Sequence, residues 1–221
     1  MMKETVTITG SNGSLGLALA KKFFNKNYSL ILHSRKKNKK ILAFKNKNNN
    51  FIYGNLEKIE NIKKICKKIN GYDSNIIINN AGIYLNKSFN KIKINEIKKI
   101  IDINFLSNIY LLKNLKISKE KKYLIININS IAGVSGTANE TIYSASKHAL
   151  KGFFDSIEQE HDNKFDIMNI YPGAFKSKIT KKRKDFNNLM SADEIADLIF
   201  ENIKKYRSLK INNIYLKRKL Y

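Results

Sequence analysis

The chain of 221 residues contains few of the residues that build disulfide, metal and membrane structures. Its single cysteine, Cys66, excludes an internal disulfide framework and a cysteine-based metal site. Apolar runs such as Ile76–Ile78 and Leu124–Ile126 are far too short to span a bilayer. The start, Met1–Val6, leads straight into a strand pattern without the core of a signal peptide. We therefore expect a cytoplasmic protein with no membrane partner and no bound metal.

Histidine is equally scarce. The three histidines, His33, His148 and His161, share no spacing typical of metal ligands, and we interpret them as structural or surface residues. Cys66 shares one side of a helix-like stretch with Ile62 and Ile65, which predicts a buried packing role for its thiol.

Acidic residues are outnumbered, with 18 Asp and Glu against 42 Lys and Arg, and the formal net charge is +24. Such a charge suits nucleic acid, an anionic membrane surface or an acidic substrate. However, Lys, Asn and Ile are in excess along the whole chain, and the densest basic runs are only Lys36–Lys40 and Lys181–Lys184. We therefore interpret the charge as compositional and keep nucleic-acid binding as the less favoured alternative.

Strand-like and helix-like patterns alternate along the chain. The predicted strands are Thr5–Thr9, Ser29–His33, Phe51–Gly54, Asn75–Asn79, Tyr123–Asn129, Phe165–Tyr171 and Ile211–Leu216. The predicted helices are Leu15–Asn27, Leu56–Asn70, Ile94–Leu115, Thr141–Glu160 and Ser191–Tyr206, the last opening with the capping box Ser191–Glu194. This alternation predicts an α/β fold, in which a parallel sheet carries helices on both faces. Without repeats or linkers, we expect a single domain over residues 1–221.

A glycine-rich turn, Thr9–Gly16, joins the first strand to the first helix. Glycines let the backbone approach a pyrophosphate closely, and the N–H groups at the helix start bind its negative charge. The turn predicts a dinucleotide site, with an ordinary strand-to-helix turn as the alternative. The expected contacts from this turn are Gly10, Ser11, Asn12, Ser14, Leu15 and Gly16.

The second predicted strand ends near the expected position of the cofactor ribose. A carboxylate there would bind the 2′-hydroxyl of NAD, but the chain has His33, Ser34 and Arg35 instead. The planar guanidinium of Arg35 can pair with a 2′-phosphate. We therefore predict that NADP(H) is preferred over NAD(H), with an incidental surface cation as the alternative reading of Arg35.

Tyr143 and Lys147 are spaced four residues apart and so share one face of a predicted helix. An ammonium group near a phenol favours the phenolate and lowers a pKa that is ordinarily near 10. The pair can therefore form one acid–base unit. In so lysine-rich a chain this spacing also arises by chance, so the pair indicates a catalytic site only if other motifs of the site accompany it. Ser130 follows one strand end and Asn79–Gly82 another, on the side where open α/β sheets bind ligands.

These motifs together resemble the classical short-chain dehydrogenase/reductase (SDR) family over nearly the whole chain. Thr9–Gly16 resembles the family's cofactor turn and Asn79–Gly82 its Asn-Asn-Ala-Gly motif. Pro172-Gly173, which contains the only proline, resembles the turn beside the nicotinamide. The matches to the family's catalytic tetrad are Asn104, Ser130, Tyr143 and Lys147. The resemblance implies a single-domain Rossmann fold with strand order 3-2-1-4-5-6-7.

The resemblance also implies a role for each tetrad residue in carbonyl reduction. Tyr143 would donate a proton to the carbonyl oxygen, and Lys147 would lower the pKa of Tyr143 and bind the nicotinamide ribose. Ser130 would orient the substrate oxygen, and Asn104 would hold a water that links Lys147 to solvent. The further cofactor contacts that it implies are Ser34, Asn55, Leu56, Asn80, Ala81, Gly82, Pro172, Gly173 and Ser177.

Three positions depart from the family pattern without removing a catalytic group. Ser14 stands where the middle glycine of the turn is usual, which could alter how closely the pyrophosphate docks. Asn55 replaces an Asp that often contacts adenine, and Ser177 replaces a Thr but keeps a hydroxyl. The basic stretch Lys176–Met190 lies where the family places its substrate loop. It predicts either attraction of an acidic substrate or, more simply, a solvated loop of a basic protein.

The leading interpretation is an NADPH-dependent oxidoreductase that interconverts a carbonyl and an alcohol on a small-molecule substrate. Within that class, reduction of a 3-oxoacyl group on an acidic carrier protein and reduction of a nucleotide-sugar or polysaccharide precursor are narrower options. A non-catalytic cofactor sensor or a nucleic-acid-binding relative is the alternative from another class. The family resemblance implies a homodimer or homotetramer built through Ile94–Leu115 and Thr141–Glu160.

Overall fold

The structure is a computed structural model that describes residues 4–72, 74–161, 163–205 and 209–219. Its seven strands form one parallel sheet in the order β3-β2-β1-β4-β5-β6-β7, which confirms the predicted topology. The strands are β1 (Thr5–Ile8), β2 (Ser29–Ser34), β3 (Asn50–Tyr53), β4 (Ser74–Asn79), β5 (Tyr123–Ile128), β6 (Phe165–Pro172) and β7 (Asn213–Leu216). The last strand begins two residues later than the sequence pattern predicts.

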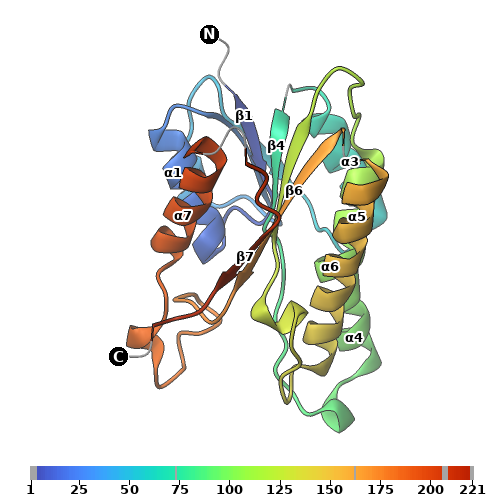
Figure 1. The fold of residues 1–221 in the computed structure, drawn as a ribbon, viewed down its shortest axis with the longest axis vertical. Coiled ribbons are helices and arrows are strands. Elements are labelled where there is room, and N and C mark those ends of the chain that lie inside the picture. The colour runs from blue at the N-terminus through green and yellow to red at the C-terminus, as the bar shows by residue number, and fades with distance from the viewer. Residues whose placement is uncertain (1–3, 73, 162, 206–208, 220–221) are drawn as a thin grey trace.

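Helices cover both faces of the sheet (Figure 1). On one face lie α1 (Ser14–Asn25), the short α2 (Lys39–Leu42) and α7 (Ala192–Lys205). On the other lie α3 (Ile59–Ile69), α4 (Ile94–Ile101), α5 (Ser107–Asn114) and α6 (Thr141–Glu160). The predicted end of the last helix, Tyr206, lies outside the described residues. Helix α7 begins with the predicted capping box, because Glu194 Oε2 accepts from Ser191 N at 2.9 Å.

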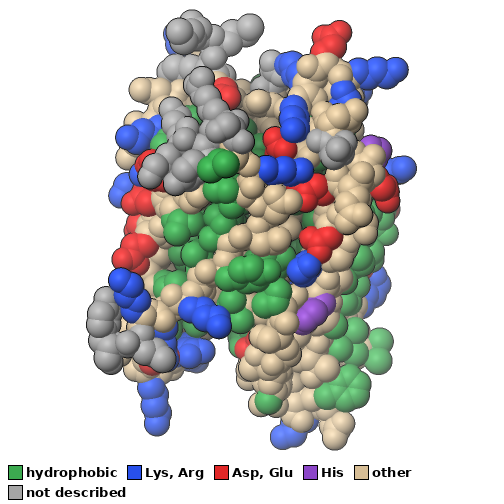
Figure 2. Space-filling model, in the orientation of Figure 1, with side chains coloured by type: hydrophobic (Ala, Val, Ile, Leu, Met, Phe, Trp, Pro, Cys, Tyr) green, Lys and Arg blue, Asp and Glu red, His purple; other side chains and the backbone are tan. Residues whose placement is uncertain are grey.

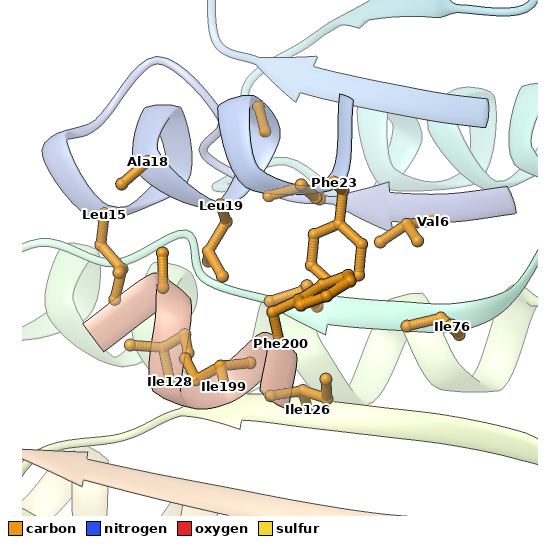
Figure 3. Close-up of a cluster of buried hydrophobic side chains, with 14 of the residues drawn as sticks. Val6, Leu15, Ala18, Leu19, Phe23, Ile76, Ile126, Ile128, Ile199 and Phe200 are labelled. Carbon is orange, nitrogen blue, oxygen red and sulfur yellow. The ribbon is translucent and has the colours of Figure 1, made fainter. Parts of the chain in front are cut away.

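The two faces of the sheet have separate cores, because successive side chains of a strand point in opposite directions. Val6, Ile76 and Ile126 pack with Phe23 of α1 and Phe200 of α7 (Figure 3). The intervening strand residues, among them Ile77, Ile125 and Ile167, pack beneath α5 and α6 on the opposite face. Continuous apolar runs are typical of parallel strands that are buried on both faces in this way.

A row of asparagines crosses four neighbouring strands on the α6 face. Asn79 of β4 donates to Asn127 of β5 at 2.9 Å, and Asn127 donates to Asn169 of β6 at 3.0 Å. Asn169 continues the row to Asn213 of β7 at 3.4 Å. Each pair is directly opposite in the strand register. The row ties together the carboxyl-end half of the sheet, from which the candidate site is built.

The predicted helix Ile94–Leu115 is interrupted. Residues Asp102–Leu106 form a π-helical turn between α4 and α5. This wider turn holds Asn104, whose side chain bonds to the neighbouring loop rather than pointing to solvent. A single π turn in an α-helix is frequently found at functional sites, and the helical periodicity of the sequence does not distinguish it from a continuous helix.

Candidate active site

A cleft of about 960 Å³ opens at the carboxyl ends of β1 to β6. Open parallel sheets bind ligands on this side. Most of the predicted site residues line it: Gly10, Asn12, Ser14, Leu15, Gly16, Arg35, Asn55, Leu56, Asn80, Ala81, Gly82, Ser130, Tyr143, Lys147, Pro172, Gly173 and Ser177. The fold thus brings together in one cleft residues that are spread over more than half of the sequence.

Three predicted site residues do not line the cleft: Ser11, Ser34 and Asn104. The Ser11 hydroxyl is buried and donates to the carbonyl oxygen of His33, and the Ser34 hydroxyl donates to that of Lys36. Each hydroxyl therefore donates its hydrogen bond to a nearby backbone carbonyl. Their expected contact with a cofactor is not supported by this geometry.

The glycine-rich turn is shaped by close backbone contacts. Gly10 has a φ of +62°, and a Cβ there would lie 2.8 Å from the Cα of Ala81. A Cβ on Gly16 would lie 2.4 Å from the Gly10 carbonyl oxygen. The side chain of Asn80 fastens the turn by donating to the carbonyl oxygens of Thr9 and Gly10 at 2.9 and 3.1 Å. The two glycines are thus required by the shape of the turn itself.

Helix α1 starts at Ser14 directly behind this turn, and its N-cap residue, Gly13, has no side chain to cap it. The first N–H groups of a helix lack partners within the helix and carry partial positive charge. They face the end of the cleft at which the turn residues lie. A phosphate fits such a site without further side chains. Ser14, which replaces the usual glycine, lines the cleft and does not close it.

Ser130, Tyr143 and Lys147 meet at the other end of the cleft. Helix α6 presents Tyr143 and Lys147 on one face, and the Lys147 Nζ lies 6.0 Å from the centroid of the phenol ring. Lys147 is buried and donates to the carbonyl oxygen of Ile128 at 2.9 Å. Ser130 follows β5 and adjoins the phenol of Tyr143, whose pKa it lowers. The three groups of the predicted acid–base unit are therefore neighbours.

The pKa of Tyr143 at this end of the cleft shifts in the direction opposite to the expectation. Burial raises the pKa of the Tyr143 phenol, the hydrogen bond with Ser130 lowers it, and the charge of Glu140 raises it further, with a net upward shift. Burial lowers the pKa of the Lys147 ammonium to about 8. The net shift is opposite to the lowering expected from the Lys147 ammonium, whose effect on the Tyr143 pKa stays a prediction.

Asn104 lies behind Lys147 instead of on the cleft wall. It is fully buried, and its amide accepts from Ile83 N at 2.8 Å and donates to Ile83 O at 2.9 Å. It also donates to Ser146 Oγ at 3.2 Å. Asn104 Oδ1 and Lys147 Nζ lie on the same side of Gly82. These bonds fix the loop after β4 against α6, and the expected water-holding role stays a prediction.

The mouth of the cleft contains residues that sequence reasoning missed. The ring of Tyr84 packs edge-on against Tyr143 with centroids 5.0 Å apart, and its hydroxyl donates to Glu140 Oε1 at 2.5 Å. Asn86 donates to the same hydroxyl at 3.3 Å. Tyr84 lies just after the Asn79–Gly82 motif and Glu140 lies just before α6. Because the two residues are far apart in the sequence, no local pattern marks their contact. Only their meeting across the cleft makes them visible.

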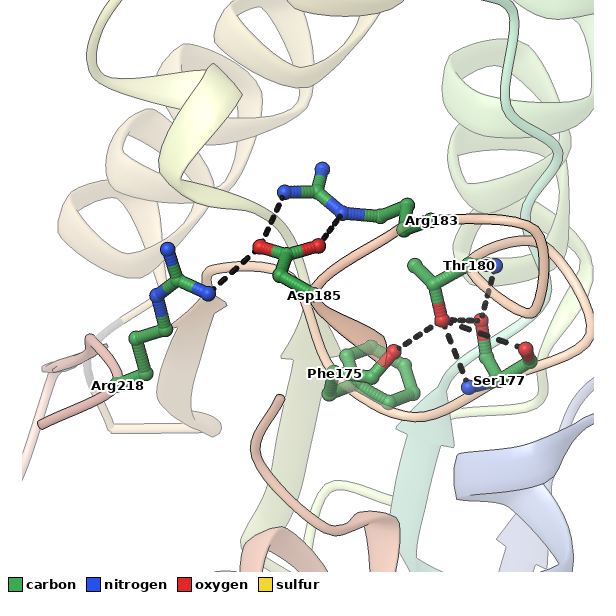
Figure 4. Close-up of polar contacts among 6 residues, drawn as sticks. All are labelled: Phe175, Ser177, Thr180, Arg183, Asp185 and Arg218. Atoms are coloured by element: carbon green, nitrogen blue, oxygen red, sulfur yellow. Dashed lines mark hydrogen bonds and ion pairs between the residues drawn. The ribbon is translucent and has the colours of Figure 1, made fainter. Parts of the chain in front are cut away.

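The predicted substrate loop is held by polar contacts (Figure 4). Asp185 binds the guanidinium of Arg183 through two bonds of 2.9 and 3.0 Å, and Arg218, from beyond β7, binds the same carboxylate at 2.6 Å. These cations hold the pKa of Asp185 well below its usual range. Near the start of the loop, Thr180 Oγ1 accepts from Ser177 N at 2.9 Å. Lys178 and Arg183 line the cleft.

Two absences among the described residues concern other functions. No group of three or more His, Cys, Asp or Glu side chains is placed there to hold a metal ion. No helix among them is long and apolar enough to cross a membrane. Cys66 is buried as predicted, and burial raises the pKa of its thiol to about 12.

Comparison with known proteins identifies clear relatives. A sequence profile of the family described as short chain dehydrogenase matches residues 4–188. The 3-oxoacyl-(acyl-carrier-protein) reductase FabG of Buchnera aphidicola subsp. Acyrthosiphon pisum is 33% identical over 81% of this chain and 77% of its own length. The protein of the same name from Buchnera aphidicola subsp. Schizaphis graminum is 30% identical over 99% of this chain and 98% of its own.

Solved structures give the same picture of the fold. The structure described as ElxO with NADP bound is 26% identical, has a TM-score of 0.85, and aligns over 97% of this chain and 98% of its own. A 4-hydroxyisoleucine dehydrogenase complexed with NADH is 22% identical, has a TM-score of 0.88, and aligns over 98% of both chains. The second likeness shows the fold alone.

Proposed function

The chain belongs to the short-chain dehydrogenase family, and from that premise we propose that it reduces a carbonyl group to an alcohol with NADPH. Membership makes it an NAD(P)-dependent oxidoreductase that acts on CH–OH groups. The single observation that carries the proposal is the convergence of Ser130, Tyr143 and Lys147 at one end of a cleft whose other end is the glycine turn. NADPH, when bound, supplies the hydride.

The cleft fits a dinucleotide. Its volume is at the upper end of the range for small-molecule sites, and the uncapped start of α1 offers N–H groups to a pyrophosphate. Gly10 and Gly16 leave no room for a Cβ, so the turn beside the uncapped helix start depends on both glycines for its shape. At the other end, Lys147 would hold the ribose hydroxyls and Pro172-Gly173 would line the nicotinamide side.

The phenol of Tyr143 is the proton donor of the proposed reduction. It keeps its proton at neutral pH, because a phenol has an ordinary pKa near 10 and burial raises it here, and it can donate that proton to a carbonyl oxygen. Ser130, which adjoins that phenol, would share the substrate oxygen and fix its position. Lys147, with a pKa of about 8, is largely charged at neutral pH and would stabilise the phenolate left behind.

Tyr143→Phe tests this mechanism. The variant keeps the ring contact with Tyr84 and loses only the hydroxyl. We expect turnover of carbonyl substrates, followed by NADPH absorbance, to fall below detection while the Kd for NADPH stays close to that of the native protein. Substantial residual turnover would contradict the role of the phenol. A native protein without NADPH or NADH binding would contradict the function as a whole.

We propose NADPH over NADH because of Arg35. It is exposed at the rim of the cleft beyond β2, and it has no carboxylate neighbour at the position where NAD-binding folds place one. Charge-assisted bonds to a 2′-phosphate contribute about 1.5–3 kcal/mol each, which corresponds to a preference of roughly tenfold to a hundredfold. Arg35→Asp should reduce kcat/KM for NADPH by that factor. A native preference for NADH would overturn the assignment.

Within this reaction class we infer that a 3-oxoacyl thioester of an acidic carrier protein is the favoured substrate. Relatives at 30–34% identity are named 3-oxoacyl-(acyl-carrier-protein) reductases, and Lys178 and Arg183 of the basic loop line the cleft. The test compares kcat/KM for a carrier-bound and a simple 3-oxo ester across salt concentrations. Attraction of the carrier predicts a steep loss with salt for the first only. Equal, salt-insensitive values would favour a neutral substrate.

Nucleic-acid binding has weaker support. On the face drawn in Figure 2, Lys and Arg side chains are scattered, and Asp and Glu side chains lie among them. Nucleic-acid binding driven by phosphate contacts would fall steeply with salt in a filter-binding assay. A protein that retains no nucleic acid even at low salt would remove this alternative. A cytoplasmic location and a homodimeric or homotetrameric state remain predictions.

A further inference from the structure

His33 is a buried imidazole in the wall of the cofactor end of the cleft, and the proposed chemistry does not use it. It is 2% exposed and stands near the end of β2, the strand between β1 and β3. Its Nδ1 lies 3.4 Å from the backbone N of Gly10, in the turn after β1. Its Nε2 lies 3.0 Å from the backbone O of Gly54, which follows β3. One ring thus connects the two strand ends that flank its own.

Its two partners fix the state of the ring. A backbone N–H can only donate and a backbone carbonyl oxygen can only accept, so Nδ1 must be the acceptor and Nε2 must carry the proton. That is the neutral Nε2–H tautomer. Burial lowers the pKa of His33, which favours the same neutral form. A protonated ring would turn an N–H toward the N–H of Gly10 and lose this bond.

The main chain of His33 is attached to the same turn. Ser11 donates to the His33 carbonyl oxygen twice, from its backbone N at 2.8 Å and from its hydroxyl at 2.9 Å. The imidazole therefore adds a bond to Gly10, the one residue of the turn with a positive φ. Gly10, His33 and Gly54 all line the cleft. One side chain thus links the phosphate turn directly to the residue that follows β3.

Resting on the proposed function, we propose that His33 is a cofactor-positioning residue that holds the Gly10 turn in its NADPH-binding shape through its Nδ1 acceptor. It touches neither substrate nor reacting atoms. Its contribution comes before binding: a turn held in place by the protein does not have to be ordered by the ligand. The effect should therefore fall on the affinity for NADPH.

Three variants separate the two bonds. In His33→Asn the side-chain oxygen takes the approximate place of Nδ1 and can accept from Gly10. In His33→Gln the amide NH₂ takes the approximate place of Nε2 and can donate to Gly54. His33→Leu keeps apolar bulk and has neither group. His161→Leu is the matched control, because His161 is exposed and lies outside the cleft. The Kd for NADPH is measured by the fluorescence of the cofactor itself, and unfolding midpoints are recorded for each variant.

Loss of one net hydrogen bond predicts that Kd rises about five- to tenfold in His33→Leu and His33→Gln. His33→Asn should restore most of the affinity, even where its unfolding midpoint is no higher than that of His33→Gln. A merely structural role would make affinity follow the midpoints. Equal affinities for the Asn and Gln variants, or a better one for Gln, would overturn the inference. That comparison decides the matter even if the Leu variant does not fold.

The native protein separates this inference from the proposed function. If it binds NADPH and all three His33 variants bind equally well, the positioning role is wrong and the oxidoreductase stands. If it binds neither NADPH nor NADH, the proposed function fails and the inference fails with it.

Discussion

Replacing Asn127 by alanine should destabilise the protein strongly, because this side chain is the centre of the asparagine row. Asn127 is fully buried, accepts from Asn79 Nδ2 at 2.9 Å and donates to Asn169 Oδ1 at 3.0 Å. In the variant, Asn79 Nδ2 and Asn169 Oδ1 stay buried and lose their hydrogen bonds to Asn127. Each such group costs about 1–3 kcal/mol, so the free energy of unfolding should fall by about 2–6 kcal/mol.

The loss can be measured as a shift in Tm. For a domain of this size about 1 kcal/mol corresponds to roughly 2–4 °C, which places the shift of Asn127→Ala between about 4 and 24 °C. Asn213→Ala is the matched control, because Asn213 is exposed at the end of the same row and water can replace it. It should lose less than about 1 kcal/mol. Equally small losses in both variants would refute the reasoning that buried amide pairing stabilises this part of the sheet.

Three further predictions concern the cleft. Gly16→Ala, whose Cβ would lie 2.4 Å from the Gly10 carbonyl oxygen, should raise the Kd for NADPH about tenfold or more, whereas Gly152→Ala, with open space around it, should not. Glu140→Gln removes a charge that raises the pKa of the catalytic phenol, so the pH profile of kcat/KM should move to lower pH; an unmoved profile would contradict this. Because the folded pKa of Lys147, about 8, lies below the ordinary 10.5, its stabilising contribution is complete above pH 10.5 and is lost as pH falls through about 8. Unfolding free energies measured across that window should rise with pH more steeply in the native protein than in Lys147→Met.

Some features of the cleft could be predicted because they are local. The turn Thr9–Gly16 combines a strand end, glycines and a helix start within eight residues, and the structure places most of it on the cleft. Tyr143 and Lys147 share a helix face at a fixed spacing, which no tertiary contact needs to decide. The pattern also predicted the strand Asn75–Asn79, and β4 lies at the centre of the sheet.

Other features could not be predicted because they depend on partners far away in the sequence. The hydroxyls of Ser11 and Ser34 are polar and well placed along the chain, yet both bond to nearby backbone carbonyls and leave the cleft. The pattern of the sequence predicted one continuous helix over Ile94–Leu115 and did not reveal the π turn at Asp102–Leu106. The upward shift of the Tyr143 pKa depends on burial and on Glu140, which no spacing expresses.

The sequence by itself determined the alternation of strands and helices, the phosphate turn and the chemical identity of the acid–base groups. All of these follow from periodicity and short-range geometry along one stretch of chain. Only the tertiary structure decided which groups meet: His33 with Gly10 and Gly54, Tyr84 with Glu140, and four asparagines across four strands. Hydrogen bonds require donor and acceptor atoms within about 3.5 Å, and only the packed sheet brings residues so distant in the chain to that separation.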